Sequence, residues 1–340
     1  MKPSDIQQLA SKGRFGKNPI KASIIETHIS WVLLSEDFAF KIKKPVKLTF
    51  LNFSTLNLRR HYCMRELFLN QTYSNIYLDV LPIRKEDDNW TIGDGNGDII
   101  DYTVRMKRLQ NEMKMDVMLN DDKLNKNHIE ILAKTISSIH REAEIVKTDF
   151  NLTSLQELFN GFGDIKPLVL KYFNESDANL IDRSIAWANK FLESHKVRMK
   201  QRKEEGFIRL VHGDLHCGNI FISNPPVIFD CIEFDDKLRE IDLLSEIGFL
   251  CMDLEAHDEP NLSDYFVDKY NKQFNVIQTK EDYEILHYYK CFRATIRAKV
   301  SILSTAQNHG SANFTENLSK SENYLKLLKN YIPSKIKIDI

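Results

Sequence analysis

Residues 29–43 alternate apolar and polar positions on both sides of a Ser-Glu-Asp turn. Alternation with a period of two is typical of strands that are buried on one face, so this stretch predicts a β-hairpin. Residues 56–73 contain no Gly or Pro and repeat apolar residues at helical spacing, which predicts a helix. Two further apolar stretches, Trp90–Ile92 and Ile99–Met106, flank the turn sequence GDGNGD and predict a second hairpin. Strands therefore dominate the first hundred residues.

Beyond about residue 107 the apolar spacing becomes helical. Residues 127–145 place a row of Ile, Leu and Ala side chains on one face of a helix. One β island interrupts this half of the chain at 208–234, where two short apolar runs flank a Ser-Asn-Pro-Pro turn. Helices are expected again from Leu243 and through 282–303. The pattern predicts an α+β protein with a strand-rich first part and a mainly helical second part.

The composition limits the possible partners. A chain of 340 residues exceeds the usual size of one hydrophobic core, which favours two lobes. Lys and Arg total 47 against 48 Asp and Glu, so no overall positive charge favours nucleic acid or an anionic membrane as a partner. The five cysteines are widely spaced and form no C-x-x-C pair, which favours a reducing compartment. With no signal sequence or membrane span in the pattern, we expect a cytoplasmic protein.

The strongest chemical signal is HGDLHCGN at 212–219, followed by an apolar strand, a turn, a second strand and Asp230. Phosphoryl transfer from a nucleotide needs a carboxylate near the acceptor hydroxyl and oxygen ligands that hold Mg²⁺ against the phosphates. Asp214 would contact the acceptor hydroxyl, while Asn219 and Asp230 would bind the metal. His212 is better placed to brace this loop than to react.

This motif resembles that of the kinase-like small-molecule phosphotransferases, the superfamily of aminoglycoside phosphotransferases and choline kinases. The H-G-D-x-H-x-x-N form, with Gly213 where protein kinases have Arg, is typical of that branch. The segments ETHISWVLL, AFKIKKPV and VIFDCIEFDDKLREIDLLSEIGFLCMDLE extend the resemblance over nearly the whole chain. They look like an uncharacterised bacterial clade whose members often carry a C-terminal P-loop domain. This chain has no P-loop motif and would be the stand-alone form.

The resemblance implies roles for further residues. Residues 38–41 (FAFK) stand where kinases have V-A-I-K, so Lys41 is expected on the α and β phosphates. Lys43 is a rival, because the period of two places it on the same face, but only Lys41 follows an Ala by two residues. When it is not a ligand, Lys43 is expected to be a solvated charge at the strand edge. Glu66, in the predicted helix, is the expected ion-pair partner of Lys41.

The resemblance also places the hinge between the lobes at Met106, Lys107 and Arg108, whose backbone would hydrogen bond adenine. Asp242 matches an acidic residue that stabilises the C-terminal lobe. One departure is the missing G-x-G-x-x-G loop, in whose place Thr27, His28 and Ser30 could donate side-chain hydrogen bonds to phosphate.

The acceptor is not identified by any motif. Between residues 230 and 259 the chain carries eleven acidic and two basic residues. This local negative charge could mark a pocket for a cationic acceptor, such as an amino sugar or an amino alcohol. Metal binding, helix capping and solvent exposure would account for the same acids equally well. The sequence also leaves open ATP against GTP and the oligomeric state.

The sequence thus predicts a two-lobed protein-kinase-like fold, with an antiparallel β N-lobe at 1–108 and a mainly helical C-lobe at 109–340. The expected function is transfer of the γ-phosphoryl group of Mg-ATP to a hydroxyl of a small molecule. A protein Ser/Thr kinase is one alternative, although D-F-G and A-P-E segments are missing. The other is a nucleotide-binding regulator without turnover, which the missing Gly-rich loop would explain.

Overall fold

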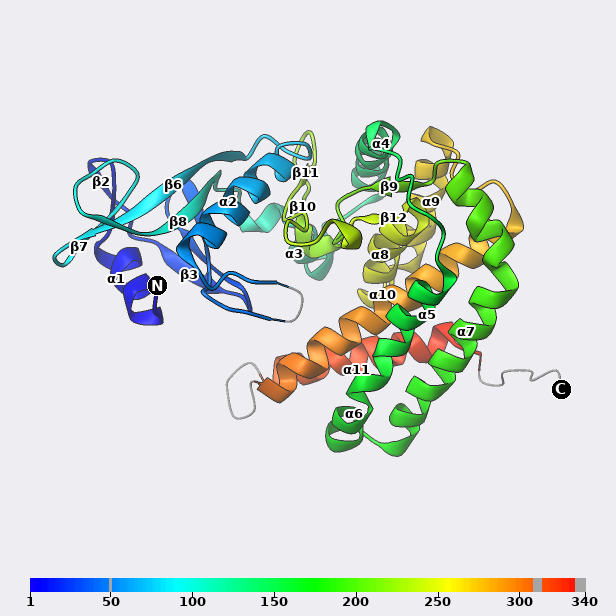
Figure 1. Ribbon diagram of the computed structural model, residues 1–340. Coiled ribbons are helices and arrows are strands. Elements are labelled where there is room, and N and C mark those ends of the chain that lie inside the picture. Colours follow the sequence, from blue (N-terminus) through cyan, green and yellow to red (C-terminus); the bar gives the residue numbers. More distant parts are fainter. Residues whose placement is uncertain (49–50, 308–313, 334–340) are drawn as a thin grey trace. The chain divides into compact units, whose positions relative to one another are not determined.

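The computed structural model describes residues 1–48, 51–307 and 314–333. It contains two compact units (Figure 1). Unit 1 comprises Met1–Met118, His212–Asp214 and Gly218–Arg239, and unit 2 comprises Leu119–Val211, Leu215–Cys217 and Glu240–Ile340. These units follow packing rather than order along the chain, so the lobe boundary predicted at residue 108 stays a prediction. The β island around residue 220 belongs to the same unit as the N-terminal sheet.

Unit 1 is built on an eight-stranded sheet with the strand order β2-β1-β7-β6-β8-β5-β4-β3. Its strands are β1 (Arg14–Phe15), β2 (Asn18–Pro19), β3 (Ser23–Glu26), β4 (Ser30–Leu34), β5 (Phe38–Lys43), β6 (Tyr77–Glu86), β7 (Asn89–Ile92) and β8 (Asp98–Lys107). All neighbouring strands are antiparallel except β1 and β7. The hairpin predicted at 29–43 is confirmed as β4 and β5.

The hairpin predicted around GDGNGD is wrong: its two strands exist, but they do not pair with each other. The strands are β7 and β8, and β6 lies between them and pairs with both. The sequence pattern of β6 hides this strand, since most of its side chains are only half-buried and a Pro stands at position 82. The Gly-rich GDGNGD segment therefore connects strands that are separated by one neighbour rather than closing a tight hairpin.

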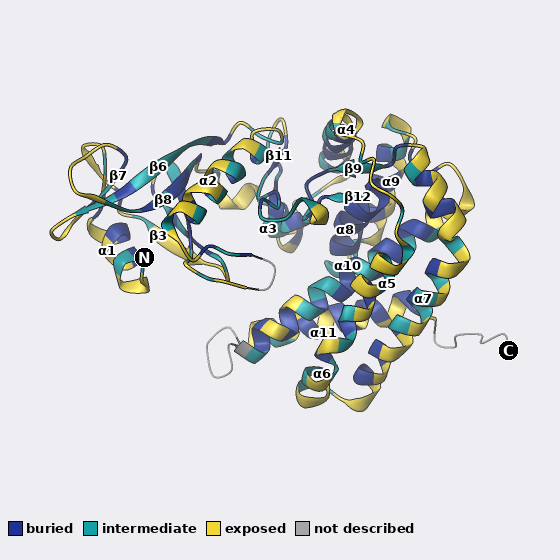
Figure 2. Cartoon of the chain, in the orientation of Figure 1, coloured by how far each residue is buried: buried dark blue, intermediate teal, exposed yellow. Residues whose placement is uncertain are grey.

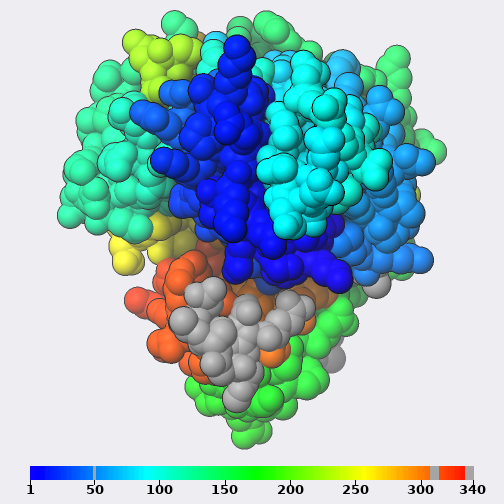
Figure 3. All heavy atoms as spheres, turned by 90° about the vertical axis from the view of Figure 1, so that its left-hand side faces the viewer, coloured from blue at the N-terminus to red at the C-terminus, as the bar shows by residue number. Residues whose placement is uncertain are grey.

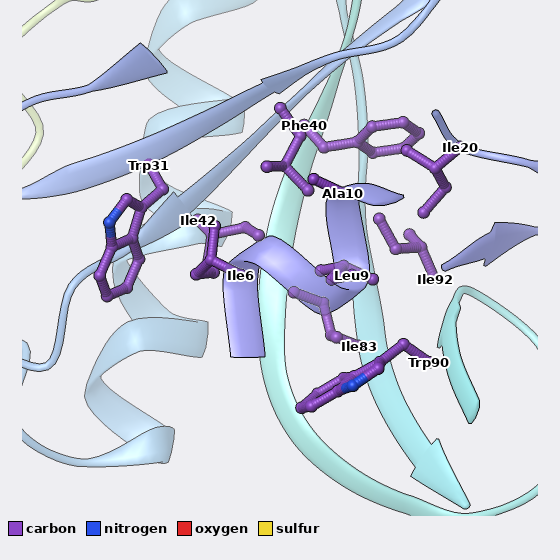
Figure 4. Close-up of a cluster of buried hydrophobic side chains, with 11 residues drawn as sticks. Ile6, Leu9, Ala10, Ile20, Trp31, Phe40, Ile42, Ile83, Trp90 and Ile92 are labelled. Atoms are coloured by element: carbon purple, nitrogen blue, oxygen red, sulfur yellow. The ribbon is translucent and has the colours of Figure 1, made fainter. Parts of the chain in front are cut away.

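Two helices cover opposite faces of this sheet. The helix α1 (Pro3–Lys12) packs Ile6 and Leu9 against Phe40 and Ile42 of β5, in an apolar core that also contains two tryptophans (Figure 4). Because successive side chains of a strand point to opposite faces, Lys41 points away from this core. The helix α2 lies on that other face.

The predicted helix at 56–73 is confirmed as α2 (Leu56–Asn70), which begins where the Thr55 side chain accepts a hydrogen bond from Leu58 N–H. The residues that α2 buries include charged and amide side chains: Arg59, Glu66 and Asn70 are almost fully buried. Buried charges are stable only when they are paired, so this face of the sheet is built for polar contacts rather than for an apolar core.

A small two-stranded sheet completes unit 1. The strands β10 (Ile220–Phe221) and β11 (Val227–Ile228) pair antiparallel and confirm the hairpin predicted around the Ser-Asn-Pro-Pro turn. The 3-10 helix η4 (Asp236–Leu238) follows them. In the space-filling view, residues from the first hundred positions form one continuous face (Figure 3).

Unit 2 is mainly helical and contains a short sheet of β9 (Ile208–Leu210) and β12 (Glu240–Asp242). Its longer helices are α4 (Lys126–Glu142), α5 (Leu152–Asn160), α6 (Lys166–Tyr172), α7 (Glu175–Glu204), α8 (Leu243–Ala256), α9 (Pro260–Gln273), α10 (Lys280–Gln307) and α11 (Phe314–Tyr331). The helix α8 is buried along nearly its whole length and forms the centre of this unit (Figure 2). The predicted α+β class is confirmed. Within the described ranges, no helix is both long and apolar enough to cross a membrane.

All five cysteines are free and buried. Burial raises the pKa of Cys63 to about 12 and that of Cys251 to about 12. The thiols of Cys63 and Cys251 therefore stay protonated at neutral pH and act as small apolar side chains.

Candidate active site

The β10–β11 hairpin brings Asn219 and Asp230 together from positions eleven residues apart. Its register pairs Ile220 with Ile228, and the Phe229 N–H continues the ladder by donating to the Asn219 carbonyl at 3.1 Å. Asp230 follows directly. The tight hairpin that the short spacing predicts is therefore present, and it places both predicted metal-binding residues at the same end of a two-stranded sheet.

The Asn219 side chain is held by Asp214. Its Nδ2 donates to the backbone carbonyl and to the Oδ2 atom of Asp214, both at 3.0 Å. This orientation uses the amide nitrogen and directs the amide oxygen elsewhere. An amide oxygen and a carboxylate, here those of Asn219 and Asp230, are oxygen donors of the kind that Mg²⁺ takes together with substrate phosphates. The residues therefore fit the predicted cation.

His212 braces the loop, as the sequence predicts. Its Nε2 lies 2.9 Å from the Phe229 carbonyl, and its own carbonyl accepts from Ile232 N–H at 3.2 Å. Gly213 has a left-handed φ of 86°, and a Cβ there would lie 3.0 Å from the Leu238 carbonyl oxygen. This close approach requires glycine and explains why the loop reads His-Gly-Asp.

Lys41 lies among carboxylates. Its Nζ is 2.8 Å from Glu66 Oε1 and also contacts Asp230 Oδ1. Burial alone lowers the pKa of the Lys41 ammonium, but Asp230 and Glu66 outweigh it and raise this pKa well above its ordinary value. The structure thus joins one predicted phosphate-binding residue, its predicted partner and one predicted metal ligand in a single cluster.

Lys43 does not lie where the strand pattern predicts it. The prediction of a solvated side chain at a strand edge is wrong, because Lys43 is fully buried. Its Nζ lies 2.7 Å from Glu66 Oε2 and also contacts Glu233 Oε1. Burial raises the pKa of Glu66, but the two lysines outweigh it and lower this pKa to about 2. The expectation of a solvated side chain failed because strand alternation puts Lys43 under α2, where Glu66 and Glu233 compensate its charge.

Glu233 is the residue of this cluster that sequence reasoning missed. Two lysines on one face of a strand, at positions 41 and 43, cannot both be neutralised by one glutamate. The excess of positive charge on this face could have indicated a further acidic partner. That partner is Glu233, in the acidic stretch after Asp230. Burial is the main cause that raises the pKa of the Glu233 carboxyl above its ordinary value.

The backbone of Asp230 is in a left-handed conformation with a φ of 64°. Its N–H donates to the hydroxyl of Tyr77 at 3.0 Å, and the next N–H, of Cys231, donates to Asn70 Oδ1 at 2.9 Å. Non-glycine residues adopt this conformation at a cost and mainly where surrounding contacts hold them. The carboxylate of Asp230 is therefore presented by a fixed backbone.

At the predicted hinge, two backbone donors are already used. Lys107 N–H donates to the Ile76 carbonyl and Arg108 N–H to the Asp37 carbonyl, both at 2.9 Å. An adenine contact at these positions would therefore use their carbonyl oxygens, and the predicted role of Met106, Lys107 and Arg108 stays a prediction. Beside them lies an apolar cluster in which Ala39, Tyr77, Val104 and Met106 are buried and Val32, Leu34, Leu109, Phe221 and Phe229 are partly buried.

The turn that stands in place of a Gly-rich loop uses its own polar groups. Thr27 Oγ1 accepts from Ser30 N–H at 3.0 Å and donates to the Ser30 carbonyl at 3.1 Å. Ser30 is fully buried. Of the predicted phosphate donors in this turn, the Thr27 hydroxyl is committed to the turn itself, and the Ser30 hydroxyl is buried without a hydrogen-bond partner among the described residues. His28 is exposed.

Much of the acidic stretch is structural. In unit 1, Asp236 pairs with Arg65 and Arg239. In unit 2, Asp242 accepts two hydrogen bonds from Arg202 and caps α8, as its predicted stabilising role requires. Asp253 accepts from Cys217 N–H at 2.9 Å and lies 3.8 Å from His216. Each of these three carboxylates therefore has a partner within its own unit.

The fold is that of the kinase-like phosphotransferases. The chain belongs to the phosphotransferase enzyme family, whose model matches residues 88–285, more than half of the chain. Uncharacterized proteins of Mycobacterium bovis and Mycobacterium tuberculosis are 26% identical to it over 293 residues, which cover 84% of this chain and 56% of theirs. The chain thus spans about half the length of the curated relatives that it matches.

Solved structures share the fold, which confirms the predicted two-lobed kinase-like class. The GDP and kanamycin complex of APH(2")-IIIa matches with a TM-score of 0.53 and 13% identity, covering 97% of this chain and 98% of that one. A choline/ethanolamine kinase family protein from Mesorhizobium loti matches with a TM-score of 0.53 and 11% identity, covering 96% and 99%. A glucosamine kinase complex with glucosamine, ADP and inorganic phosphate matches with a TM-score of 0.51 and 10% identity, covering 91% and 79%.

Proposed function

We propose that this protein is a Mg-ATP-dependent kinase that transfers the γ-phosphoryl group to a hydroxyl of a small molecule. The observation that carries the proposal is the contact of Lys41 with both Glu66 and Asp230. Phosphoryl transfer is catalysed mainly by positioning and by charge compensation, and it needs a cation on the phosphates and a carboxylate on the metal. A lysine held between these carboxylates has the charge and the location for that task.

Each residue has a defined role in this reaction. Lys41 would move from Asp230 to the phosphates while Glu66 keeps it in position. Asp230 and the amide oxygen of Asn219 would hold Mg²⁺, which supplies charge neutralisation of the phosphates when bound. Asp214 would orient the acceptor hydroxyl and accept its proton. A bond forms between the acceptor oxygen and the γ-phosphorus, the bond to the bridging oxygen breaks, and ADP leaves.

The partly buried apolar cluster around Ala39 and Met106 is proposed as the nucleobase site. Aromatic side chains of Phe221 and Phe229 in that cluster suit a flat purine. Apolar contacts of this kind do not discriminate adenine from guanine, and the similar structures contain GDP in one case and ADP in another. Both nucleotides therefore belong in the first binding experiment.

Amino sugars and amino alcohols are proposed as the first acceptors to screen. The similar structures include complexes with kanamycin and with glucosamine, and a member of the choline/ethanolamine kinase family. The acidic stretch adds no support, because most of its carboxylates have partners within the fold. A neutral polyol series should accompany the cationic one.

The decisive experiment is a thermal-shift titration with Mg-ATP, Mg-GTP and metal-free ATP. A ligand at 100 times its Kd stabilises a folded protein by about 2.7 kcal/mol. We expect a magnesium-dependent rise in Tm for the wild type and its loss in Asp230→Asn. Asp88→Asn is the matched control, since Asp88 is exposed in the β6–β7 turn. The absence of any nucleotide-dependent shift in the wild type would exclude the proposal.

A nucleotide-binding regulator without turnover is the second candidate. The observation that favours it is the turn at 27–30, where the Thr27 hydroxyl bonds to the Ser30 backbone and the Ser30 hydroxyl is buried, so that neither hydroxyl is presented to phosphate. Weak phosphate binding by this turn would lower turnover more than it would lower the affinity for the nucleotide. Nucleotide-dependent stabilisation without phosphate transfer to any acceptor or to water would favour this candidate, and steady turnover would exclude it.

A further inference from the structure

Lys43 has a chemical environment that the proposed reaction does not use. Its ammonium contacts two carboxylates, Glu66 and Glu233, and lies 4.8 Å from the centre of the Phe53 ring. Only 1% of its side chain is exposed, against 11% for Lys41. Lys43 therefore has no route to a nucleotide phosphate, and its charge acts only on the groups around it.

The first of these groups is Glu66, whose two oxygens are divided between the lysines. Oε1 lies 2.8 Å from Lys41 and Oε2 lies 2.7 Å from Lys43. A carboxylate held at one oxygen by a buried ammonium cannot rotate freely about its last bond. Lys43 thus fixes the plane of the Glu66 carboxylate and directs the other oxygen toward Lys41.

The second group is Glu233, which belongs to the segment that carries Asp230. This segment is attached to α2 at further points. Arg65 Nε donates to the Glu233 carbonyl at 2.6 Å, and Asn70 accepts from Cys231 N–H at 2.9 Å. Asn70 in turn donates to the Glu66 carbonyl at 2.9 Å. The segment and the helix are therefore joined on both sides of the Lys43–Glu233 contact.

We propose that Lys43 and Glu233 form a positioning ion pair that fixes both the phosphate-binding lysine, through Glu66, and the metal-binding Asp230, through its own segment. The inference rests on the proposed nucleotide site and adds two positioning residues to it. One buried ammonium would then hold both Glu66 and the segment that carries Asp230 in place before a nucleotide binds.

Stability alone does not explain this pair. Replacement of a buried ion pair by apolar side chains of similar size is often neutral or stabilising, whereas removal of one partner alone is strongly destabilising. A pair that served only the fold could therefore be exchanged for two apolar residues without consequence. An ion pair that positions Asp230 could not be exchanged in this way, because a contact between apolar side chains does not fix the direction of a carboxylate.

The test compares Lys43→Met, Glu233→Gln and the double variant K43M/E233M with the wild type. The first readout is the Mg²⁺ concentration that gives half of the ATP-dependent rise in Tm. We expect this concentration to rise about 10-fold in Glu233→Gln, as for other groups that orient a metal ligand. The double variant should regain the ligand-free Tm of the wild type but keep the raised Mg²⁺ requirement. Lys44→Met is the control, because Lys44 pairs with the exposed Glu26.

The second readout needs no ligand. Amide hydrogen exchange of the peptide 229–233 reports whether Cys231 N–H keeps its bond to Asn70, and we expect faster exchange in all variants except Lys44→Met. A double variant with the Mg²⁺ requirement and the exchange rate of the wild type would overturn the positioning role. A wild type without a nucleotide response would instead exclude the proposed function, while unchanged exchange in Glu233→Gln would by itself overturn this inference.

Discussion

At the scale of the residue, the proposed catalytic segment contains two left-handed backbone positions, Gly213 and Asp230. Glycine adopts this conformation at no steric cost, whereas for other residues the cost is about 1–2 kcal/mol. The cost at Asp230 is offset by the hydrogen bond of its N–H to Tyr77 and by the contact of its carboxylate with Lys41. Local strain is thus retained where it directs a reactive group.

Asp214 is the residue on which turnover should depend most. Loss of a positioned general base typically lowers a rate by about 10²–10⁴-fold. We expect Asp214→Ala to lower phosphate transfer by this factor. The affinity for Mg-ATP should change much less, because the backbone carbonyl at position 214 still accepts a hydrogen bond from the Asn219 side chain. Coupled measurement of ADP release and a nucleotide titration test both parts. Unchanged turnover would remove Asp214 from the mechanism.

Gly213 should tolerate no side chain. In Gly213→Ala the new Cβ would lie 3.0 Å from a carbonyl oxygen while φ is 86°. We expect a loss of roughly 2 kcal/mol in the free energy of unfolding, measured by urea denaturation. Gly161→Ala is the matched control, because φ there is −58° and the nearest atom to a new Cβ lies at 3.6 Å. Equal stability of the two variants would contradict the account of the loop.

At the scale of elements, α7, α8 and α10 in unit 2 are joined by buried charges. Arg202 of α7 binds Asp242 at the start of α8 and Asp282 of α10, and Arg198 binds Asp282 through two further hydrogen bonds. Burial would raise the pKa of Asp282, but Arg198, the Gln278 N–H and Arg202 outweigh it and lower this pKa to about 2. The helices are therefore held by ionised groups.

This network predicts a pH dependence of stability. The folded pKa of Asp282 lies below its unfolded value of about 3.9, so its contribution is complete above that pH and is lost as the pH falls toward 2. The contribution amounts to roughly 2 kcal/mol. Asp282→Asn should destabilise the protein by about 3 kcal/mol at pH 7, the lower end for a broken buried pair. Arg198 and Arg202 each lose one partner but keep another, Glu205 and Asp242 respectively.

Urea denaturation at several pH values tests this prediction. The difference between wild type and Asp282→Asn should shrink between pH 4 and pH 2, as the wild type loses the charge that the variant lacks. Asp264→Asn, at an exposed position of α9, should follow the wild type throughout. A difference that stayed constant below pH 4 would show that Asp282 titrates at its ordinary value.

The elements also show where the sequence suffices and where it does not. The hairpin β4–β5, the helix α2 and the hairpin β10–β11 were predicted because each depends on contacts between near neighbours in the chain. The pairing of β8 was not predicted, because β6 lies between β7 and β8 in the sheet and the half-buried pattern of β6 is a weak signal. In the same way, spacing was enough to propose Asp214, Asn219 and Asp230, whereas the Lys43–Glu233 pair joins residues 190 positions apart.

At the scale of the whole molecule, position along the chain and membership of a packing unit differ. The hairpin β10–β11 follows α7 and β9 in sequence but packs within unit 1. Segments that share a cooperative unit lose hydrogen-exchange protection together. We expect the amides of β10 and β11 to lose exchange protection at the same denaturant concentration as those of β5 and α2. The amides of α7 should lose protection independently. Opening together with α7 would contradict the division into units.

The burial of all five cysteines has a practical consequence for spectroscopy. Thiol reagents attack the thiolate of an accessible cysteine, and none of these side chains is exposed. Burial also raises the pKa of Cys63, Cys251 and Cys291. The native chain should therefore remain unmodified by a maleimide dye over the time in which an accessible cysteine reacts completely. A single cysteine introduced at the exposed Phe68 of α2 would then carry one fluorophore per molecule in the otherwise unaltered chain, a ready reporter of motion in that helix.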